Sequence, residues 1–331
     1  MLSDVAPISQ YRKQRRVYES TLSLYDVTLP TRRTIRKLYR HLIELTYLLR
    51  PWLDTPDYPT VFAETRLRTF VRTAKWSRII ETLLHLAPMT HRHHDRVLRV
   101  IHDIRGGALT SLTLYLQMAE RGDLLARDIP QMVLLANDHA KILRSMIVDL
   151  DRIRYTLDEL FVPQPIDVVT TTWHAKHYRI PSGHTAWVTV ECPVVGYVAE
   201  SMIELAALER VLYNLVNNAV RHCAQPHVGI RITPSPHVVD MVTIEVWNTL
   251  DAQQYRRLLQ LCPDTNWQRL VRESLSTTGS GLGLGICADI VAHMCGMDHV
   301  EQVMAARYFH VDATPTSFHV QFAWPLVDLG Q

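Results

Sequence analysis

The sequence has 331 residues, of which 47% are hydrophobic and 21% are charged, and its formal net charge is +2. These values predict a folded globular protein of two or three domains. No apolar run approaches the roughly 20 residues that span a bilayer, and the N-terminal stretch MLSDVAPISQYRKQRR lacks the apolar core of a signal peptide. We therefore expect a cytoplasmic protein without a membrane span.

The five cysteines are scattered and form no CxxC pair, which favours reduced thiols over a disulfide framework or a zinc site. The charge is uneven, because residues 1–100 hold 18 Lys and Arg against 9 Asp and Glu, and the remainder carries −7. Basic clusters at residues 12–16 and at Arg32 and Arg33 suit nucleic acid or an anionic membrane. Since no recognition-helix or zinc-finger signature accompanies them, we favour a solvated face or a dock for an acidic partner.

Residues 1–86 are expected to form a helical input domain. Helical periodicity runs from about Val17 to Leu86, with expected breaks at Pro51, Pro56 and Pro59. The segment 54–59 is expected to be a connector, because proline lacks an amide donor and restrains the residue before it. No familiar sensor motif indicates a signal.

Residues 87–162 are expected to form a hairpin of two long helices. The first, from Val97 to Glu120, reads VLRVIHDIRGGALTSLTLYLQMAE, and the second runs from Ile129 to about Leu160 after a turn at 121–123. Apolar residues recur at three- and four-residue steps in both helices. They are Leu98, Ile101, Ile104, Ala108, Leu112 and Leu116 in the first helix, and Met132, Leu135, Ile142, Met146, Leu150, Ile153 and Leu157 in the second.

A histidine cluster precedes the first of these helices. His91 and Asp95 have the four-residue spacing of a helical metal-ligand pair, with His93 and His94 between them. Polar helix starts commonly carry such residues, and no matching second pair is evident, so we expect no metal site there.

Residues 163–331 change in character after Pro163 and Pro165, and a domain boundary is expected between Phe161 and Ile166. Short β-rich pieces alternate with helices, which predicts an α/β sandwich with helices on one face of a largely antiparallel sheet. The expected strands are 167–173, 185–191, 227–233, 238–247 and 318–324, and the expected helices are 204–223 and 284–295.

Three motifs follow one another in a suggestive order. They are IHDIRGGALTSL around His102, ERVLYNLVNNAVRH at 209–222, and TTGSGLGLGICADIVAHMCG at 277–296. Together they resemble the H, N and G2 boxes of two-component sensor histidine kinases, over about Val97 to Leu326. The resemblance implies a hairpin that dimerises into a four-helix bundle and a C-terminal Bergerat ATP-binding domain, the fold shared with gyrase, HSP90 and MutL. A monomeric hairpin packed on the N-terminal helices is the alternative.

In the N box, Asn214 and Asn218 are four residues apart on one helix, so their amides face the same side. The resemblance makes Asn218 the magnesium ligand and Asn214 a residue on the phosphate side, with Arg221 and His222 near the phosphates. A neutral Asn carbonyl suits a magnesium ion that bridges phosphates and keeps several waters. A capping or surface pair of asparagines is the alternative.

The G2 box is the most specific local signal. Its glycines allow close backbone approach before a helix whose first amides can receive phosphate oxygens. No Lys-Ser/Thr follows, as a Walker loop requires, and the spacing and late position argue against a Rossmann fingerprint. The resemblance assigns nucleotide contacts to Gly279, Gly281, Leu282, Gly283 and Leu284.

The G1 box departs from the family pattern. The family supplies an aspartate followed by glycines, whereas this chain has Asn248 within VWNTL and no glycine. Because Asn248 keeps a carbonyl acceptor for the adenine amino group, we expect ATP binding that is weaker than usual. Residues 251–276 would form the mobile ATP lid.

In the H box the resemblance makes His102 the phosphoryl acceptor. Asp103 can hold the proton of one imidazole nitrogen and so present the other nitrogen as the nucleophile. Gly106 replaces the polar residue that the family uses for dephosphorylating its partner, which places phosphatase activity in doubt. The glycines at 106 and 107 should each cost about 1 kcal/mol relative to alanine and could supply a bend.

Together these features predict a dimeric, ATP-dependent and magnesium-dependent protein-histidine kinase. It would phosphorylate His102 and transfer the phosphoryl group to an aspartate of a response-regulator receiver domain. One alternative is a degenerate kinase that serves as a phosphotransfer relay or scaffold. Another is a superfamily ATPase acting on nucleic acid, which is disfavoured because His102 and Asp103 would then have no role.

Overall fold

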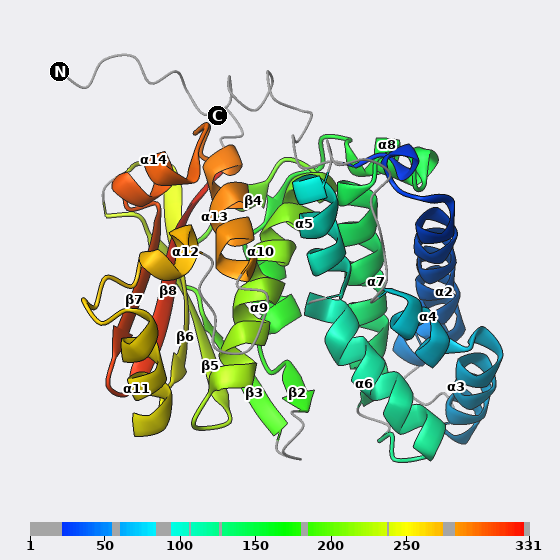
Figure 1. Ribbon diagram of the computed structural model, residues 1–331. Coiled ribbons are helices and arrows are strands. Elements are labelled where there is room, and N and C mark those ends of the chain that lie inside the picture. Colours follow the sequence, from blue (N-terminus) through cyan, green and yellow to red (C-terminus); the bar gives the residue numbers. More distant parts are fainter. Residues whose placement is uncertain are drawn as a thin grey trace. The chain divides into compact units, whose positions relative to one another are not determined.

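The computed structural model describes residues 22–54, 60–83, 94–105, 107–125, 128–179, 185–236, 238–273 and 282–327. The chain divides into a helical unit, residues 20–157, and an α/β unit that holds residues 158–331. Figure 1 labels the elements of both. The helical unit contains η1 (Leu24–Asp26), α2 (Leu29–Asp54), α3 (Thr60–Ala74), α4 (Trp76–Leu83), α5 (His94–Arg105), α6 (Gly107–Arg121), α7 (Asp128–Met146) and α8 (Arg152–Asp158).

Helix α7 lies at the centre of the helical unit. The helix α2 packs along it, and α6 packs against both α7 and α3 (Figure 1). Of the 19 residues of α7, 15 are buried, so nearly its whole circumference is covered. The predicted stripe is confirmed at Met132, Leu135, Ile142 and Met146. The core of this unit is thus organised around the second helix of the predicted hairpin.

The first helix of the predicted hairpin is described in two parts, one on each side of Gly106. Helix α5 ends at Arg105 and α6 begins at Gly107, with Gly106 outside the described residues. The described residues between Val97 and Glu120 are all helical, as predicted. Ile101, Ile104, Leu112 and Leu116 are buried as predicted, whereas Leu98 is 40% exposed. The side chain of Ala108 is outside the description.

The second helix of the hairpin is also shorter than predicted. It stops at Met146, whose carbonyl accepts a 2.7 Å hydrogen bond from the backbone nitrogen of Leu22, and Leu22 pairs with Ile147 in an isolated bridge. Asp149 then accepts a 2.7 Å bond from the backbone nitrogen of Leu24. These contacts with an N-terminal segment end α7, and long-range partners of this kind leave no periodic signal.

The chain resumes as the short helix α8, which has no buried residue. Ile153 and Leu157 are 78% and 58% exposed, so their prediction as core residues is wrong, and Leu150 is half-buried. Pro51 lies inside α2 rather than ending it. It stands in the last turn of α2, so the one backbone hydrogen bond that is lost with its amide lies close to the end of the helix. Pro56 and Pro59 are outside the described residues.

The α/β unit holds two short paired strands, a six-stranded sheet and the helices that cover it. Its elements are β1 (Gln164–Pro165), α9 (Asp167–Trp173), β2 (His177–Arg179), β3 (Thr185–Glu191), β4 (Tyr197–Ala199), α10 (Met202–His222), β5 (His227–Pro234), β6 (Met241–Thr249), α11 (Ala252–Leu261), α12 (Arg269–Arg272), α13 (Leu282–Met294), α14 (Val300–Ala305), β7 (Phe309–Thr314) and β8 (Ser317–Pro325).

The large sheet has the order β2-β3-β5-β6-β8-β7. Only the β3–β5 pair is parallel, so the prediction of a largely antiparallel sheet is confirmed. Three helices pack against this sheet (Figure 1): α9 contacts β3, α10 contacts β5 and β6, and α13 contacts β8. Alternation along β3 buries Ala186, Val188 and Val190 on the helix side and leaves Trp187 and Glu191 exposed on the other.

The segment 167–173, which we predicted as a strand, is the helix α9. Its Val169 and Trp173 are four residues apart and both are buried, which is the helical rather than the strand period. The Trp173 ring lies 4.6 Å from that of Tyr213 in α10. Packing against α10 therefore overrides the strand preference of the Val and Thr residues. Strands β2 and β7 were not predicted.

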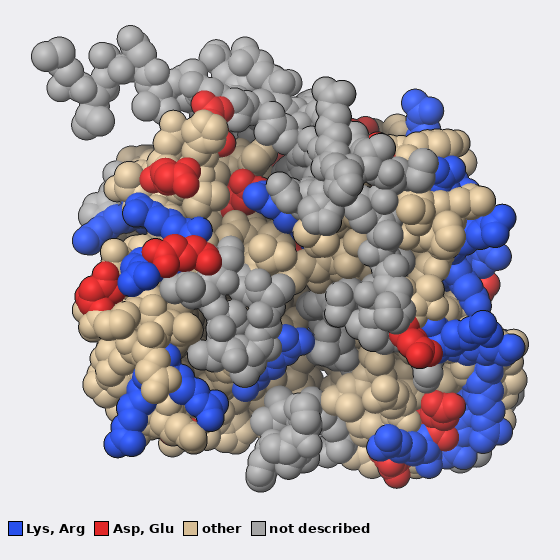
Figure 2. Space-filling model, in the orientation of Figure 1, with Lys and Arg blue, Asp and Glu red and all other residues tan. Residues whose placement is uncertain are grey.

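Among the described residues, no helix combines the length and apolar character needed to cross a membrane. All five cysteines are free thiols. Figure 2 shows Lys and Arg side chains gathered over α2 and α3. On α2, Arg33, Arg36, Lys37 and Arg40 are exposed at the spacing of one helix face, and no ion pair of theirs is found within the described part of the chain. The basic residues at 12–16 lie outside it.

Candidate functional site

The H-box histidine lies near the end of α5. The Nδ1 atom of His102 is 3.2 Å from Oδ1 of Asp103, and the two side chains are 24% and 3% exposed. The bond occupies Nδ1 and leaves Nε2 on the opposite side of the ring as the nitrogen with a free lone pair. Asp103 is thus placed for the orienting role that the sequence predicts. The side chains of His94 and Asp95 and the residues 91–93 lie outside the description.

The N-box residues lie on α10, which begins with Ser201 as its N-cap, the Oγ atom accepting from the Glu204 backbone. Asn214 is buried and Asn218 half-buried, one turn apart. Between them, Asn217 is also buried, and its Nδ2 donates to the Tyr213 carbonyl of the same helix at 2.8 Å. Asn217 is therefore a structural residue, and Asn218 is the more accessible of the three amides.

A buried lysine, which the sequence analysis missed, supports α10. Lys176 follows α9, is 2% exposed, and donates from Nζ to the Tyr213 hydroxyl at 2.7 Å. Its ammonium also lies 4.3 Å from the centre of the Trp173 ring and 4.6 Å from that of Tyr213, a cation–π arrangement. Because Tyr213 precedes Asn214, this cluster fixes the N-box turn. Lys176 and Tyr213 lie far apart in the sequence, so no local sequence pattern predicts their contact.

Asn248, the G1 residue, lies in β6 and is 2% exposed. Its Nδ2 donates to the carbonyls of His222 and Thr249 at 3.2 and 3.0 Å. The first bond ties the C-terminus of α10 to β6. Both bonds use the amide nitrogen, and no bond of its Oδ1 is found among the described residues, so the acceptor needed for adenine remains available.

The described part of the G2 box forms the start of α13. Leu282, Gly283 and Leu284 are its first described residues, while Gly279 and Gly281 lie outside the described part of the chain. Helix α13 packs along α10, and the Cys287 thiol reaches the Val211 carbonyl at 3.8 Å. The N and G2 boxes are therefore neighbours, and Asn248 is tied to the N box through His222.

The C-terminal end of α10 carries positive charge. Arg221 is exposed and His222 half-buried. Burial lowers the pKa of His222, and the positive charges of Arg221 and Arg257 lower it further. Arg257 belongs to α11, within the predicted lid, and was not among the predicted site residues. Cations at this end of α10 fit the predicted proximity to phosphate.

The predicted lid contains ordered helix. Asp251 caps α11 through a reciprocal pair of bonds with Gln254, at 2.7 and 2.8 Å. The helix has no buried residue. The short helix α12 follows, and the last residues of the predicted lid, 274–276, lie outside the description.

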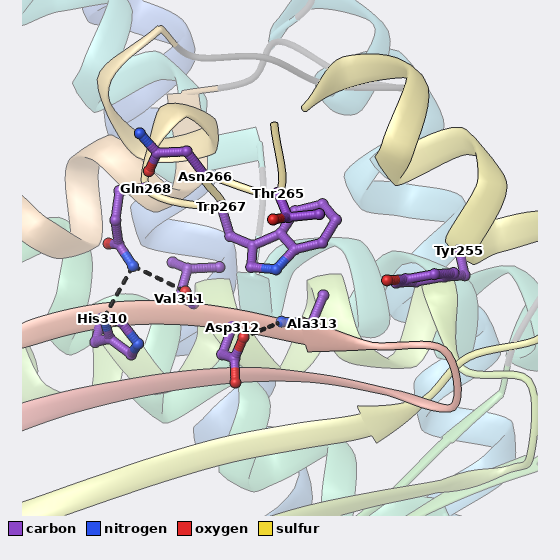
Figure 3. A pocket seen from close by; sticks show the side chains of 9 residues that line it. All are labelled: Tyr255, Thr265, Asn266, Trp267, Gln268, His310, Val311, Asp312 and Ala313. Atoms are coloured by element: carbon purple, nitrogen blue, oxygen red, sulfur yellow. Dashed lines mark hydrogen bonds between the residues drawn. The ribbon is translucent and has the colours of Figure 1, made fainter. Parts of the chain in front are cut away.

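A pocket of about 460 Å³ lies against the edge strand β7 and contains none of the predicted site residues. Figure 3 shows its lining. Gln268 donates to the Val311 carbonyl at 2.8 Å, and Asp312 accepts from the Ala313 nitrogen at 2.8 Å. Both bonds involve the strand's backbone, so these side chains protect the edge against pairing with another strand. Five of the lining residues, Tyr255 and residues 265–268, belong to the predicted lid, and the other four belong to β7.

Comparisons with known proteins agree with this arrangement. Residues 204–325 match the family model described as the histidine kinase-, DNA gyrase B-, and HSP90-like ATPase. The match begins in the first turn of α10, ends at the last residue of β8, and contains the N, G1 and G2 positions. No curated protein matches the chain. The C-terminal region is thus similar to the ATPase domains of this superfamily, a similarity that supports the predicted ATP-binding fold.

Proposed function

We propose that the protein is a cytoplasmic protein-histidine kinase that phosphorylates its own His102 with ATP. The proposal is carried by one combination within a single chain. Residues 204–325 match an ATPase domain that histidine kinases use, and the helical unit presents a partly exposed histidine paired with an adjacent carboxylate. A plain ATPase would give that pair no role.

The nucleotide site of this proposal is built from α10, β6 and α13. Amide oxygens of Asn214 and Asn218 suit magnesium, the acceptor of Asn248 suits the adenine amino group, and the G2 sequence would lie near the phosphates. Arg221 and Arg257 add positive charge near the phosphates. Asn218 would hold a magnesium ion, whose charge would offset that of the phosphates when bound.

Phosphoryl transfer requires little covalent work from the protein. The lone pair of His102 Nε2 attacks the γ-phosphorus, a P–N bond forms, and the bond to the β–γ bridging oxygen breaks, so that ADP leaves with that electron pair. The imidazole becomes cationic, and the buried carboxylate of Asp103 stabilises it through Nδ1–H. A receiver aspartate would then attack the phosphorus while the P–N electron pair returns to the ring.

The partners in this proposal are a response-regulator receiver domain and a second copy of the chain. The basic face on α2 offers complementary charge to an acidic partner. The packing of α2 along α7 favours the alternative of a monomer, because α2 already covers part of the hairpin surface that a second copy would contact. The mass of the purified protein in solution, measured by light scattering, distinguishes dimer from monomer.

The experiment that tests the proposal is incubation with magnesium and γ-labelled ATP, followed by acid treatment of the labelled protein. We expect acid-labile label on the wild type and none on His102→Ala or Asn218→Ala. Asn217→Ala is the matched control, since its amide bonds only within α10, and it should retain label. Acid-stable label, or label that persists in His102→Ala, would contradict the proposal.

A second candidate function is a phosphotransfer relay or scaffold without ATP-driven phosphorylation. It is favoured by Asn248, which replaces the family's aspartate, and by the missing G1 glycines. Folded wild-type protein that takes no label from ATP, but accepts a phosphoryl group on His102 from a phosphorylated receiver domain, would support the relay. Calorimetry with ATP then distinguishes a site that binds without transfer from one that does not bind.

A further inference from the structure

The pocket against β7 has no part in the proposed kinase mechanism. It is lined by residues of α11, of the segment that leads into α12, and of strand β7 (Figure 3). Its volume of about 460 Å³ falls within the range of about 300–1,000 Å³ that small-molecule sites occupy. The pocket is therefore large enough for a small organic ligand, and the chemistry of its lining indicates the class of that ligand.

Two aromatic rings contribute to the lining. Tyr255 of α11 and Trp267 have ring centroids 6.2 Å apart, with an angle of 53° between the ring planes. Trp267 is 6% exposed, so packing fixes its ring, whereas Tyr255 is half-buried. Thr265 has a φ of 55°, a conformation that β-branched residues rarely adopt, and it turns the chain shortly before Trp267. The electron-rich faces of such rings attract cations.

The histidine of the lining does not add a positive charge. Nε2 of Gln268 donates to the Val311 carbonyl at 2.8 Å, and this contact identifies the atom as the amide nitrogen. The same Nε2 lies 2.9 Å from Nδ1 of His310. Because an amide nitrogen only donates, Nδ1 of His310 is the acceptor, and the imidazole is in its neutral form.

The lining thus has one ionised group, the carboxylate of Asp312, and it contains no Lys or Arg. Oδ1 of Asp312 accepts from the Ala313 nitrogen at 2.8 Å, and no hydrogen bond or ion pair of its Oδ2 is found in the described part of the chain. Arg269, the residue after Gln268, donates to both carboxylate oxygens of Glu273 at 2.8 and 2.9 Å. Its charge is therefore already matched, and the negative charge of the pocket favours a cationic ligand.

These features fit an organic cation better than a metal ion. Protein metal sites surround the ion with several oxygen, nitrogen or sulfur ligands. Within the described ranges, no group of three or more His, Cys, Asp or Glu side chains could hold a metal ion. An alkylated ammonium group needs only aromatic faces and a nearby negative charge, and the pocket has both.

We propose that this pocket binds a small organic cation that carries an alkylated ammonium group. The alkyl groups contact the rings of Tyr255 and Trp267, and Asp312 supplies the opposite charge. Because five lining residues belong to the predicted lid and four to β7, a bound cation connects the lid to the edge of the sheet. The proposal uses none of the residues assigned to nucleotide binding or to phosphoryl transfer, so it is independent of the proposed kinase function.

The test measures binding of choline to the full chain by saturation-transfer NMR of the choline methyl protons. The matched ligand is 3,3-dimethylbutan-1-ol, which has the same shape but a neutral carbon in place of the ammonium nitrogen. Attraction of the charge to the rings and to the carboxylate should make choline bind at least about 5-fold more tightly than the alcohol. Added salt should weaken the binding of choline and leave that of the alcohol unchanged.

Two variants test the assigned residues. Asp312→Asn removes the charge at nearly constant shape and keeps an oxygen that can accept from Ala313, and Tyr255→Leu removes one ring. Each should weaken choline binding by at least about 5-fold. The matched control is Glu301→Gln, because Glu301 is an exposed carboxylate of α14 outside the lining, and it should bind choline as the wild type does. Circular dichroism verifies folding of each variant.

The outcomes decide the proposal without reference to ATP. Absence of choline binding, or equal affinities of the wild type for choline and the alcohol, would overturn it. Wild-type choline binding by a folded Asp312→Asn variant would overturn it as well. If Tyr255→Leu does not fold, Asp312→Asn is sufficient, because that side chain is exposed. A protein that binds choline but takes no label from ATP would contradict the kinase proposal alone.

Discussion

The indole ring of Trp247 lies directly over the backbone of Gly229, its cross-strand partner in the central β5–β6 pair. A Cβ atom added at Gly229 would overlap the indole. The ring is also flanked by the imidazoles of His227 and His319, with centroids 5.2 and 6.4 Å away. The absence of a side chain at Gly229 is thus what allows Trp247 to lie flat on the sheet.

Gly229→Ala should lower the free energy of unfolding by about 1–3 kcal/mol, the usual cost of overpacking. Urea denaturation followed by circular dichroism measures it. In a Trp247→Ala background, the same change should cost little, because the overlapping ring is gone. Equal costs in both backgrounds would show that the indole is not the cause.

Asn248→Asp should weaken nucleotide binding even though it restores the residue type of the family. The Nδ2 atom of Asn248 donates to two carbonyls, and a carboxylate there would face two acceptors in a buried position. Losing these bonds should cost roughly 1–3 kcal/mol of stability. Calorimetric titration with ATP and urea denaturation measure the two effects. Tighter ATP binding at unchanged stability would contradict the expectation.

The helical unit should lose stability as the pH falls below about 6.5. Burial lowers the pKa of His139 from 6.5 to about 4, against the opposing effects of Asp103 and Asp138. The unfolded chain therefore binds the proton first, and stability is lost between pH 6.5 and 4, by about 3 kcal/mol in total. The free energy of unfolding, measured by denaturation at several pH values across this range, should depend less on pH in His139→Leu than in the wild type. An unchanged slope in that variant would assign the loss to other groups.

Lys37→Glu should stabilise α2. Lys37 stands four residues after Arg33 and three before Arg40, and like charges at these spacings cost about 0.2–0.5 kcal/mol per pair. Reversing one charge replaces repulsion with attraction, so the melting temperature should rise. If the basic face also docks the receiver domain, phosphotransfer should slow at the same time and become less sensitive to salt. Unchanged phosphotransfer would indicate that the face is only solvated.

The sequence predicted best the features that depend on local periodicity. Strand β3 was predicted at its observed bounds, α10 within two residues at each end, and the C-terminal end of α13 within one residue, because alternation and capping depend on neighbouring residues. The segment 167–173 was misassigned because its Val and Thr residues favour strands, whereas packing of Trp173 against Tyr213 selects a helix.

For the site, motifs identified the residues but not their supports. His102 and Asp103 form a pair on α5, and Asn214 and Asn218 lie one turn apart on α10. The bond of Lys176 to Tyr213 joins segments that are distant along the chain, and side-chain identity alone does not reveal such a pair. The early end of α7 has the same origin, since it depends on Leu22.

The packing of α2 along α7 has a mechanical consequence. The helices of residues 29–83 share one hydrophobic core with the acceptor helix, so they are not a separate sensory module attached through a linker. A ligand or partner that displaced α2 would uncover α7, which also packs against α5, the helix of His102. In the proposed kinase, the N-terminal helices and the phosphoryl acceptor would therefore belong to the same cooperative folding unit.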